Sequence, residues 1–268
     1  MPELPEVETV LRTLEKKIAG EEILGVAVRY PKMIDRIPEA FAQKLIGKHF
    51  LQFERRGKYL LFGMEDVVLC SHLRMEGKYW ILPEDAPLDR HTHVIFELAD
   101  GRQLRYHDTR KFGRMELLEP DFDRRTFHGL GPEPFSPEWN GAYLYRIVKQ
   151  RSTPIKSLLL DQSVVAGIGN IYADEILFAC GIRPRVSSRR LTKTQCEAIV
   201  EATRDILSRA IQAGGTTIRS YTSSLGVSGL FQLSCNVHAQ KTCQQCGQMI
   251  KIVRVGGRSS YYCPRCQK

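Results

Sequence analysis

The 268-residue sequence contains no run of about 18 consecutive apolar residues, the length that a membrane-spanning helix needs. Its beginning also lacks the order of a secretion signal, in which basic residues precede an apolar stretch and then small residues. Internal repeats and low-complexity tracts are absent as well. We therefore expect a cytoplasmic protein that is not attached to a membrane.

Acidic residues are fewer than basic ones, 30 against 39, which gives a formal net charge of +9. Such an excess favours a polyanionic partner such as nucleic acid, although composition alone fits a merely basic soluble protein equally well. The length is sufficient for two medium domains with a small additional module.

The order of hydrophobic patterns predicts an α+β protein. Apolar residues recur at helical spacing over Glu6–Ile18, so we expect an amphipathic opening helix that stops at Gly20. Short runs rich in β-branched and aromatic residues follow and suit an antiparallel sandwich. We place these strands at Gly25–Tyr30, Lys58–Phe62, Val67–Leu73, Thr92–Leu98 and Gln103–Tyr106.

The second half of the sequence is typical of a helical domain. Three prolines within Gly131–Pro137 cannot continue a helix or a central strand, so this segment is predicted as the interdomain linker. The last predicted helix begins with a possible capping box, Thr194 with Glu197, and ends before Gly214. The predicted helices are Gly141–Gln150, Ile155–Leu160, Ile171–Cys180 and Thr194–Ala213.

Four of the eight cysteines have the spacing of a zinc site. Cys243 and Cys246 form one C-x-x-C pair, and Cys263 and Cys266 form a second after sixteen intervening residues. In a reducing compartment this pattern favours metal over disulfide, and four thiolates would make one structural zinc ion without an open coordination position.

The remaining cysteines and the hairpin between the zinc pairs have simpler interpretations. Cys235 and His238 could compete for the metal, but the two pairs already satisfy it. Apolar neighbours predict that the other three are small core residues, namely Cys70, Cys180 and Cys196. The hairpin is basic, so DNA phosphate is its expected target, through Lys251, Arg254 and Arg258.

The N-terminus offers a candidate nucleophile. A methionine before a small residue is normally removed, which would leave Pro2 with a free secondary amine. An α-amino group has a pKa near about 8, against about 10.4 for lysine, so far more of it is neutral and nucleophilic at pH 7. Glu3 and Glu6 could move a proton near a sugar ring. The alternative is an ordinary helix entry with proline in its first turn.

Six segments, in order along the whole chain, together resemble the bacterial formamidopyrimidine-DNA glycosylases, also called 8-oxoguanine DNA glycosylases. They are Pro2–Thr9, Arg55–Lys58, Ser71–Gly77, Asp108–Gly113, Val165–Tyr172 and the terminal cysteine hairpin. The resemblance implies an N-terminal β-sandwich with an opening helix, a helix-two-turns-helix domain and a four-cysteine zinc finger. It places the catalytic domain at 1–130, the linker at 131–139, the DNA-binding domain at 140–232 and the finger at 233–268.

The resemblance also implies removal of oxidised purines by base-excision repair, followed by β,δ-elimination through a Schiff base. Pro2 would be the nucleophile at C1′, Glu3 the proton donor, Lys58 the acid for β-elimination and Arg258 the residue for δ-elimination. From its neighbours alone, Lys58 could equally extend its ammonium from a strand edge into solvent. The implied partner is double-stranded DNA with oxidised bases or abasic sites, bound by a monomeric bacterial protein.

By the same resemblance, further residues contact DNA. Met75, Arg110 and Phe112 would fill the gap left by the extruded base, although apolar residues in a β-rich domain are more often core. The segment Gly167–Asn170 would hold a phosphate at a helix N-terminus, with Asn170 as cap and contact. The other implied contacts are His72, His91, Arg151 and Lys156, and the pair His91 and His93 is more typical of a strand than of a metal site.

Two rival functions stay open on the sequence: an endonuclease VIII-like glycosylase for oxidised pyrimidines, and a zinc-finger protein that binds lesions without cutting. Residues Pro2–Glu6 with Met75, Arg110 and Phe112 argue against the first. The chain departs from its relatives at Val237–Gln240, where they usually carry Val-Tyr-Gly and a basic residue, and at Gly257–Tyr261. Thr216–Gly229 corresponds to a lesion-capping loop that varies among relatives.

Overall fold

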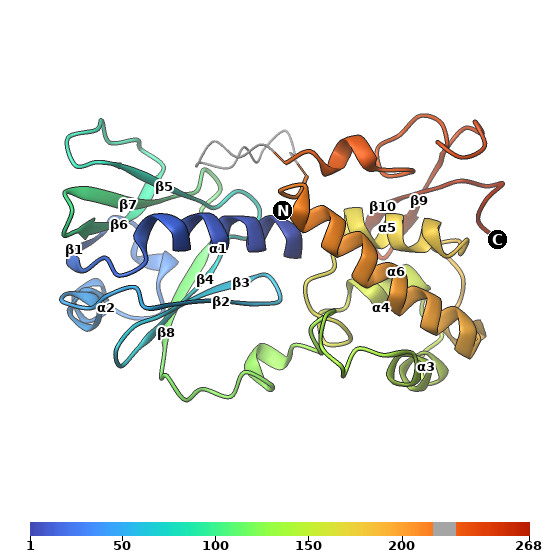
Figure 1. Cartoon of the computed structure of the whole chain (residues 1–268), viewed down its shortest axis with the longest axis horizontal. Coiled ribbons are helices and arrows are strands. Elements are labelled where there is room, and N and C mark those ends of the chain that lie inside the picture. Colours follow the sequence, from blue (N-terminus) through green and yellow to red (C-terminus); the bar gives the residue numbers. More distant parts are fainter. Residues whose placement is uncertain (217–228) are drawn as a thin grey trace. The chain divides into compact units, whose positions relative to one another are not determined.

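The computed structural model describes residues 1–216 and 229–268 and consists of two compact units (Figure 1). Unit 1 contains Met1–Pro2 and Glu6–Asp123, and unit 2 contains Glu3–Pro5, Arg124–Thr216 and Leu230–Lys268. The predicted lesion-capping loop lies almost wholly outside the described residues. The division comes earlier than the predicted linker, because Gly131 donates its amide to the carbonyl of Gln162 at 2.8 Å and Trp139 is fully buried within unit 2.

Unit 1 is an antiparallel β-sandwich with a helix against it. One sheet has the order β1-β6-β7-β5 and the other the order β2-β3-β4-β8. The strands of the first sheet are β1 (Ile23–Val28), β5 (Lys78–Pro83), β6 (Thr92–Leu98) and β7 (Arg102–His107). Those of the second are β2 (Gln52–Arg56), β3 (Tyr59–Gly63), β4 (Val68–His72) and β8 (Arg114–Leu118). A short helix, α2 (Pro38–Leu45), and a 3₁₀ turn (Pro31–Met33) complete the unit.

The opening helix α1 (Leu4–Ile18) contributes its apolar stripe to the core that both sheets share. Val7, Val10, Leu14 and Ile18 are buried there, as their helical spacing predicts. The chain then turns at Gly20, which adopts a φ of 81°, and the Gly20 amide donates to the carbonyl of Phe50. The predicted helix is confirmed, with a start two residues earlier.

Unit 2 is helical and ends in a two-stranded hairpin. Its helices are α3 (Gly141–Lys149), α4 (Ile155–Leu160), α5 (Asn170–Ala179) and α6 (Lys193–Gln212), and the hairpin strands are β9 (Lys251–Val255) and β10 (Arg258–Tyr262). Short 3₁₀ turns lie at Phe127–Gly129, Ser188–Arg190 and Phe231–Ser234. A second core, around Trp139, Leu144, Ile176 and Leu207, fills this unit.

The capping box of α6 differs from the predicted one. Thr192 is the N-cap, its hydroxyl accepts from the Gln195 amide at 3.2 Å, and the Gln195 side chain accepts from the Thr192 amide at 3.0 Å. The prediction of Thr194 with Glu197 was wrong by two residues, because glutamine closes such a box as well as glutamate.

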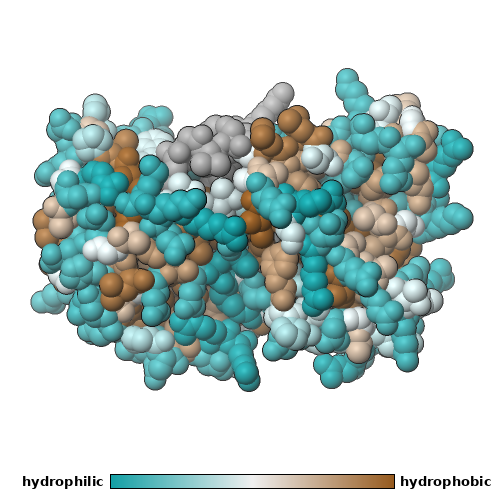
Figure 2. Space-filling model, in the orientation of Figure 1, coloured by the Kyte–Doolittle hydropathy of each residue, from teal (hydrophilic) through white to brown (hydrophobic). Residues whose placement is uncertain are grey.

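On the face drawn in Figure 2, hydrophilic side chains predominate and apolar ones lie in separate spots. Within residues 1–216 and 229–268, no helix combines the length and the apolarity that crossing a membrane requires.

Two loops of unit 1 close against one buried tyrosine. A Cβ atom added to Gly77 would lie 2.0 Å from the Tyr106 hydroxyl oxygen, and one added to Gly113 would lie 1.8 Å from it. Neither position therefore accepts a side chain unless the core tyrosine moves. The loops that end at Gly77 and Gly113 carry Met75 and Phe112 respectively, so Tyr106 fixes where both residues emerge.

We expect Gly113→Ala to lower the free energy of unfolding by about 1–3 kcal/mol, the usual cost of overpacking a core. The midpoint of urea unfolding measures this change. Gly25→Ala is the matched control, because its Cβ would meet mainly the end of the Glu97 side chain, which can turn away. Equal midpoints for the two variants would contradict the assigned role of Tyr106.

Candidate active site and nucleic-acid interface

Glu3, near the beginning of the chain, is held by the start of α5. Pro2 and Glu3 are both buried. One Glu3 carboxylate oxygen, Oε1, accepts a hydrogen bond from the Ile171 amide at 3.1 Å, and the other, Oε2, lies 3.5 Å from the Tyr172 amide. Helices leave their first amides without intrahelical partners and carry partial positive charge there, so this end of α5 stabilises a carboxylate.

The glycines before α5 make room for this arrangement. A Cβ on Gly169 would lie 2.1 Å from the Glu3 carboxyl carbon, and one on Gly167 would lie 2.5 Å from a Leu4 methyl carbon. The amides of this segment were predicted to hold a DNA phosphate, with Asn170 as the cap. The cap is corrected, because the N-cap is Gly169 and not Asn170. The amides of Ile171 and Tyr172 hold Glu3, and the phosphate contact of Gly167–Asn170 stays a prediction.

Asn170 instead connects α5 to the hairpin. Its side-chain amide donates to the carbonyl of Ser259 at 3.0 Å, and the Lys156 ammonium donates to the same carbonyl at 3.2 Å. Ser259 follows Arg258, which is exposed where the turn of Gly256 and Gly257 enters β10. Two donors from α4 and α5 thus fix the backbone next to the Arg258 side chain.

Lys156 is not an exposed DNA contact. Its side chain is fully buried, and its ammonium pairs with Asp174 Oδ1 at 2.7 Å, a carboxylate that is also fully buried. Burial lowers the pKa of Lys156, and the charge of Asp174 opposes this effect. The direct contact implied by the resemblance is corrected to a structural ion pair, in which loss of one partner would leave an uncompensated buried charge.

The base of the hairpin is attached to α5 through two adjacent acidic residues. The Glu175 carboxylate accepts from the amides of Asn236, Val237 and His238 at 2.8–3.0 Å. His238 Nδ1 lies 2.8 Å from Asp174 Oδ2. The unusual Val237–Gln240 segment is therefore anchored by polar contacts, and Ala239 adopts a φ of 59°, a conformation that favours the glycine usual in relatives.

Lys58 lies in the turn between β2 and β3 and is only 6% exposed. It does not extend from a strand edge into solvent, which removes the simpler interpretation. Arg55 fixes this turn, because its guanidinium donates to the Gly57 carbonyl at 3.0 Å and to Glu8 Oε2 of α1 at 2.9 Å. The opening helix and the Lys58 turn are thus held together within unit 1.

The turn after β4 carries His72 and Met75. His72 Nδ1 accepts from the Arg74 amide at 2.9 Å, which sets the start of the turn, and Arg74 adopts a φ of 53°. Met75 is half-buried and does not belong to the core. The Thr109 hydroxyl donates to the Glu76 carboxylate and so links this turn to the loop after β7.

The loop after β7 is organised by Asp108, which is fully buried. Its carboxylate accepts from the amides of Arg110, Phe112 and Gly113 at 2.8–2.9 Å. Phe112 is 47% exposed, and the Arg110 guanidinium lies 4.8 Å from its ring centroid. An aromatic ring at the surface under a guanidinium suits contact with unstacked bases better than a place in the core.

His91 lies beside this loop and is half-buried. Its carbonyl accepts from the Asp108 amide at 3.0 Å, and its ring meets the His107 ring edge-on with centroids 5.6 Å apart. His93 is buried, and its Nε2 lies 2.8 Å from the Asp108 carbonyl. It is therefore a strand residue, as the sequence favoured, and not half of a metal-binding pair with His91.

In unit 2, Arg151 follows α3 with 41% of its side chain exposed. Its guanidinium pairs with Asp161 at 2.7 Å, a partner that orients the side chain while part of it faces solvent. An exposed, oriented guanidinium is suited to a phosphate.

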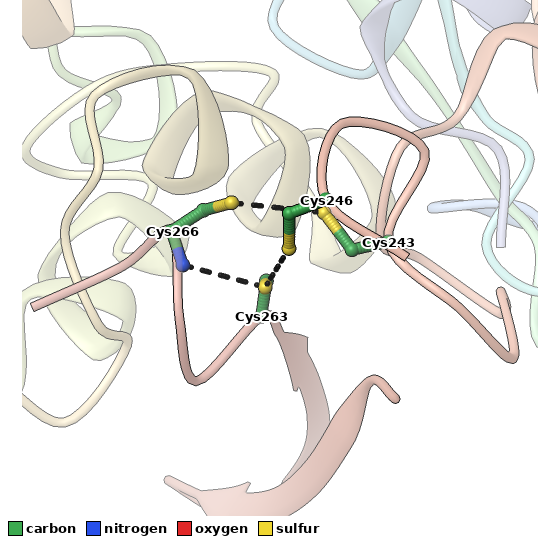
Figure 3. A group of neighbouring side chains, drawn as sticks. All are labelled: Cys243, Cys246, Cys263 and Cys266. Carbon is green, nitrogen blue, oxygen red and sulfur yellow. Dashed lines mark hydrogen bonds between the residues drawn. The ribbon is translucent and has the colours of Figure 1, made fainter. Parts of the chain in front are cut away.

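The four zinc-spaced cysteines point toward one another from two loops (Figure 3). The sulfurs of Cys243 and Cys266 lie 3.8 Å apart, and those of Cys246 and Cys263 lie 3.5 Å apart. Tetrahedral thiolates at a Zn–S distance of about 2.3 Å are separated by about 3.8 Å, so the sulfurs fit one zinc ion. Cys235 bonds to the Phe231 carbonyl and stays outside the cluster, as does His238.

The other cysteines are unsuited to redox chemistry. Burial raises the pKa of Cys70 strongly, that of Cys180 to about 12 and that of Cys196 to about 11. Thiols with such values contain almost no thiolate at neutral pH. The prediction of small core residues agrees with buried Cys70 and Cys196, whereas Cys180 is only partly buried against the core of unit 2.

Three sequence models of protein families match the chain consecutively. The formamidopyrimidine-DNA glycosylase N-terminal domain matches residues 1–115, the H2TH domain of the same glycosylases matches 130–222, and a zinc finger found in FPG and IleRS matches 240–268. The formamidopyrimidine-DNA glycosylase of Bacillus licheniformis is 47% identical over the full length of both chains, and that of Streptococcus pneumoniae is 45% identical over 100% of this chain and 99% of its own. The chain belongs to the formamidopyrimidine-DNA glycosylase family.

Solved structures of this family agree with the fold. A complex of Lactococcus lactis Fpg with DNA containing an abasic site superposes with a TM-score of 0.93, at 39% identity and with 99% of each chain covered. A complex of the same Fpg with N7-benzyl-Fapy-dG DNA gives a TM-score of 0.94 over all of both chains, also at 39% identity. The predicted fold class and the single structural zinc site of a formamidopyrimidine-DNA glycosylase are confirmed.

The sequence did not reveal several residues that position this glycosylase's site: Arg55, Asp108, Asp174 and Glu175. Arg55 and Asp108 lay in quoted motifs, but their roles there were not identified. Each is a charged residue that binds backbone or another buried group, and nothing in the local sequence distinguishes it from a surface charge.

Gly169→Ala is expected to lower the rate of base removal at least about tenfold, because it displaces the Glu3 carboxylate from the helix amides, and one charge-assisted hydrogen bond is worth about 1.5–3 kcal/mol. Single-turnover excision measures the rate. Gly169 has a φ of −129°, so alanine causes no backbone strain, and the melting temperature reports only what the displaced carboxylate costs the fold. An unchanged rate would show that Glu3 does not require this position.

Cys243→Ser is expected to abolish both zinc binding and DNA binding, because three thiolates hold a structural zinc poorly and the hairpin that carries Arg258 loses its order. Metal content by atomic absorption and DNA affinity by gel shift measure the two losses. Cys196→Ala is the matched control, since Cys196 is buried in the core around Trp139 and Leu207 and does not belong to the zinc cysteines. DNA binding that survives in zinc-free Cys243→Ser would contradict the function assigned to the finger.

Proposed function

We propose that this chain is a bifunctional DNA glycosylase and lyase of base-excision repair that removes oxidised purines through the amine of Pro2. The observation that carries the proposal is the fixation of the N-terminus: Glu3, directly after Pro2, has its carboxylate bound by the Ile171 amide at 3.1 Å in a cradle that Gly169 leaves open. Removal of Met1 would convert the Pro2 nitrogen from an amide into a secondary amine.

The reaction follows from the chemistry of that amine. Its neutral form attacks C1′ of the damaged nucleotide, the bond from C1′ to the base breaks, and the base leaves with its electron pair and takes up a proton. Attack leaves an ammonium on Pro2, and the Glu3 carboxylate takes up its N–H proton and passes it to the ring oxygen O4′; the C1′–O4′ bond then breaks, which opens the sugar and leaves an iminium between Pro2 and C1′. The α-amino pKa of about 8 makes Pro2 a better nucleophile at neutral pH than any unperturbed lysine.

Strand cleavage follows from the iminium. Because the iminium withdraws electrons, a proton leaves C2′ and the 3′ phosphate departs by β-elimination, the step assigned to Lys58. Loss of a second proton expels the 5′ phosphate by δ-elimination, the step assigned to Arg258. Hydrolysis then releases Pro2, and a one-nucleotide gap with phosphates at both ends remains.

Access to the sugar requires that the damaged nucleotide leave the base stack, at a cost of a few kcal/mol. Exposed Phe112, half-buried Met75 and the Arg110 guanidinium are carried by loops fixed on buried groups, so they can replace the stacking and pairing that the extruded base loses. His72, His91, Arg151 and Asn170 are proposed to bind the flanking phosphates.

The net charge of +9 supports binding to a polyanion, and the basic hairpin adds phosphate contacts. We propose that the protein acts as a monomer on duplex DNA. It would be cytoplasmic in bacteria and associated with the nucleoid through that DNA.

Borohydride reduction tests the proposal. With protein shown by mass spectrometry to begin at Pro2, reduction should trap a covalent complex on duplex DNA that contains 8-oxoguanine or an abasic site. Pro2→Gly should trap less, because a primary amine replaces the more basic secondary one, and a chain whose N-terminus is blocked by a retained extension should trap nothing.

Absence of a trapped band with the correctly processed protein would overturn the enzymatic function and leave a protein that only binds lesions. Faster excision of thymine glycol than of 8-oxoguanine would instead assign the chain to oxidised pyrimidines.

A further inference from the structure

The loop between β5 and β6, residues 84–91, lies over a polar row of unit 1. On β7, Leu104 and Tyr106 face the core, so Gln103, Arg105 and His107 alternate onto the opposite face of the sheet. All three are buried, at 2–8% exposure. The loop itself contributes no buried side chain between Glu84 and Arg90, so apolar packing does not hold it in place.

Arg105 holds the first half of this loop. Its guanidinium donates to the carbonyls of Ala86 at 3.0 Å, Pro87 at 3.1 Å and Glu84 at 3.2 Å. Its Nε donates to the Gln103 side-chain oxygen at 2.7 Å. A planar fork of donors that meets several carbonyls at once requires a guanidinium, because the ammonium of lysine offers a single point of attachment.

His107 holds the second half. Its Nε2 lies 3.0 Å from Asp89 Oδ1, and the same oxygen accepts from the His91 amide at 2.7 Å. The His107 ring stacks on Trp80 with centroids 4.4 Å apart, which fixes its plane. The loop therefore reaches His91 with both halves attached to the row on β7.

We propose that Arg105 is a positioning residue for DNA binding, which fixes the loop so that His91 is presented to the phosphate backbone. The inference rests on the proposed function, since it takes His91 as a DNA contact. It adds to that function a residue that is only 2% exposed and acts through the loop carbonyls and the Gln103 side chain of its own unit.

The test is a double-mutant cycle with Arg105→Lys, His91→Ala and the double variant, measured as affinity for a duplex that contains a stable tetrahydrofuran abasic analogue. Arg105→Lys and His91→Ala should each weaken binding about tenfold, the equivalent of about 1.4 kcal/mol, and the double variant should be no weaker than His91→Ala. Arg102→Lys is the matched control on the same strand, because Arg102 binds Asp100 and the Lys17 carbonyl at the surface instead of the loop.

The outcomes separate this inference from the proposed function. Independent effects that add in the double variant, or normal binding by Arg105→Lys, would overturn the role of Arg105. Normal binding by His91→Ala would also overturn it, while borohydride trapping by the wild type would still support the enzyme.

Should Arg105→Lys fail to fold, Asp89→Ala detaches the other half of the loop without touching Arg105, and the same cycle with His91→Ala applies. Hydrogen exchange provides a second readout, in which the amides of residues 84–91 should exchange faster in Arg105→Lys while those of the core strands stay protected. Uniformly faster exchange would reduce Arg105 to a residue of general stability.

Discussion

The hydrogen bond between the Glu3 carboxylate and the Ile171 amide is the constraint on which the active N-terminus depends. A chain end is normally mobile, because few contacts oppose its conformational entropy. Here a buried carboxylate occupies amides that α5 cannot satisfy internally, and its negative charge meets the positive end of the helix. A Cβ on Gly169 would occupy the place of the Glu3 carboxylate, so Glu3 can bind these amides only because residue 169 is glycine.

The same principle recurs where the chain presents exposed side chains. Asp108 accepts from three amides of the loop that carries Phe112, and Glu175 accepts from three amides of the segment before the zinc cysteines. Arg105 donates to the carbonyls of Glu84, Ala86 and Pro87. Buried polar groups fix these loops without covering them with apolar residues. A surface fixed in this way stays open to a charged and hydrated partner, and its geometry is still set before the partner arrives.

The sequence predicted the elements and sites whose signals are local. The ends of β6 and α4 match their predicted ranges, and the cysteine spacing located the zinc site. It missed β2, which reads Gln52–Arg56 with a single apolar residue. It also missed β5, Lys78–Pro83, although Tyr79–Leu82 is a continuous apolar and aromatic run. The carboxylate at the start of α5 was also missed, because Glu3 and Ile171 are 168 residues apart and Gly167–Asn170 has the composition of a phosphate-binding turn.

Lys156 shows why the position of a residue in a family does not define its physical role. Its buried ammonium is neutralised by Asp174, and its remaining hydrogen bond goes to the Ser259 carbonyl, which Asn170 also binds. Because that carbonyl belongs to the residue after Arg258, the lysine controls where an exposed arginine emerges without meeting a phosphate. In this chain His238 occupies the second oxygen of Asp174, so the ion pair and the zinc hairpin share one carboxylate. One buried carboxylate thus connects α4, α5 and the segment before the zinc cysteines, and removing it would leave the Lys156 charge buried and unpaired.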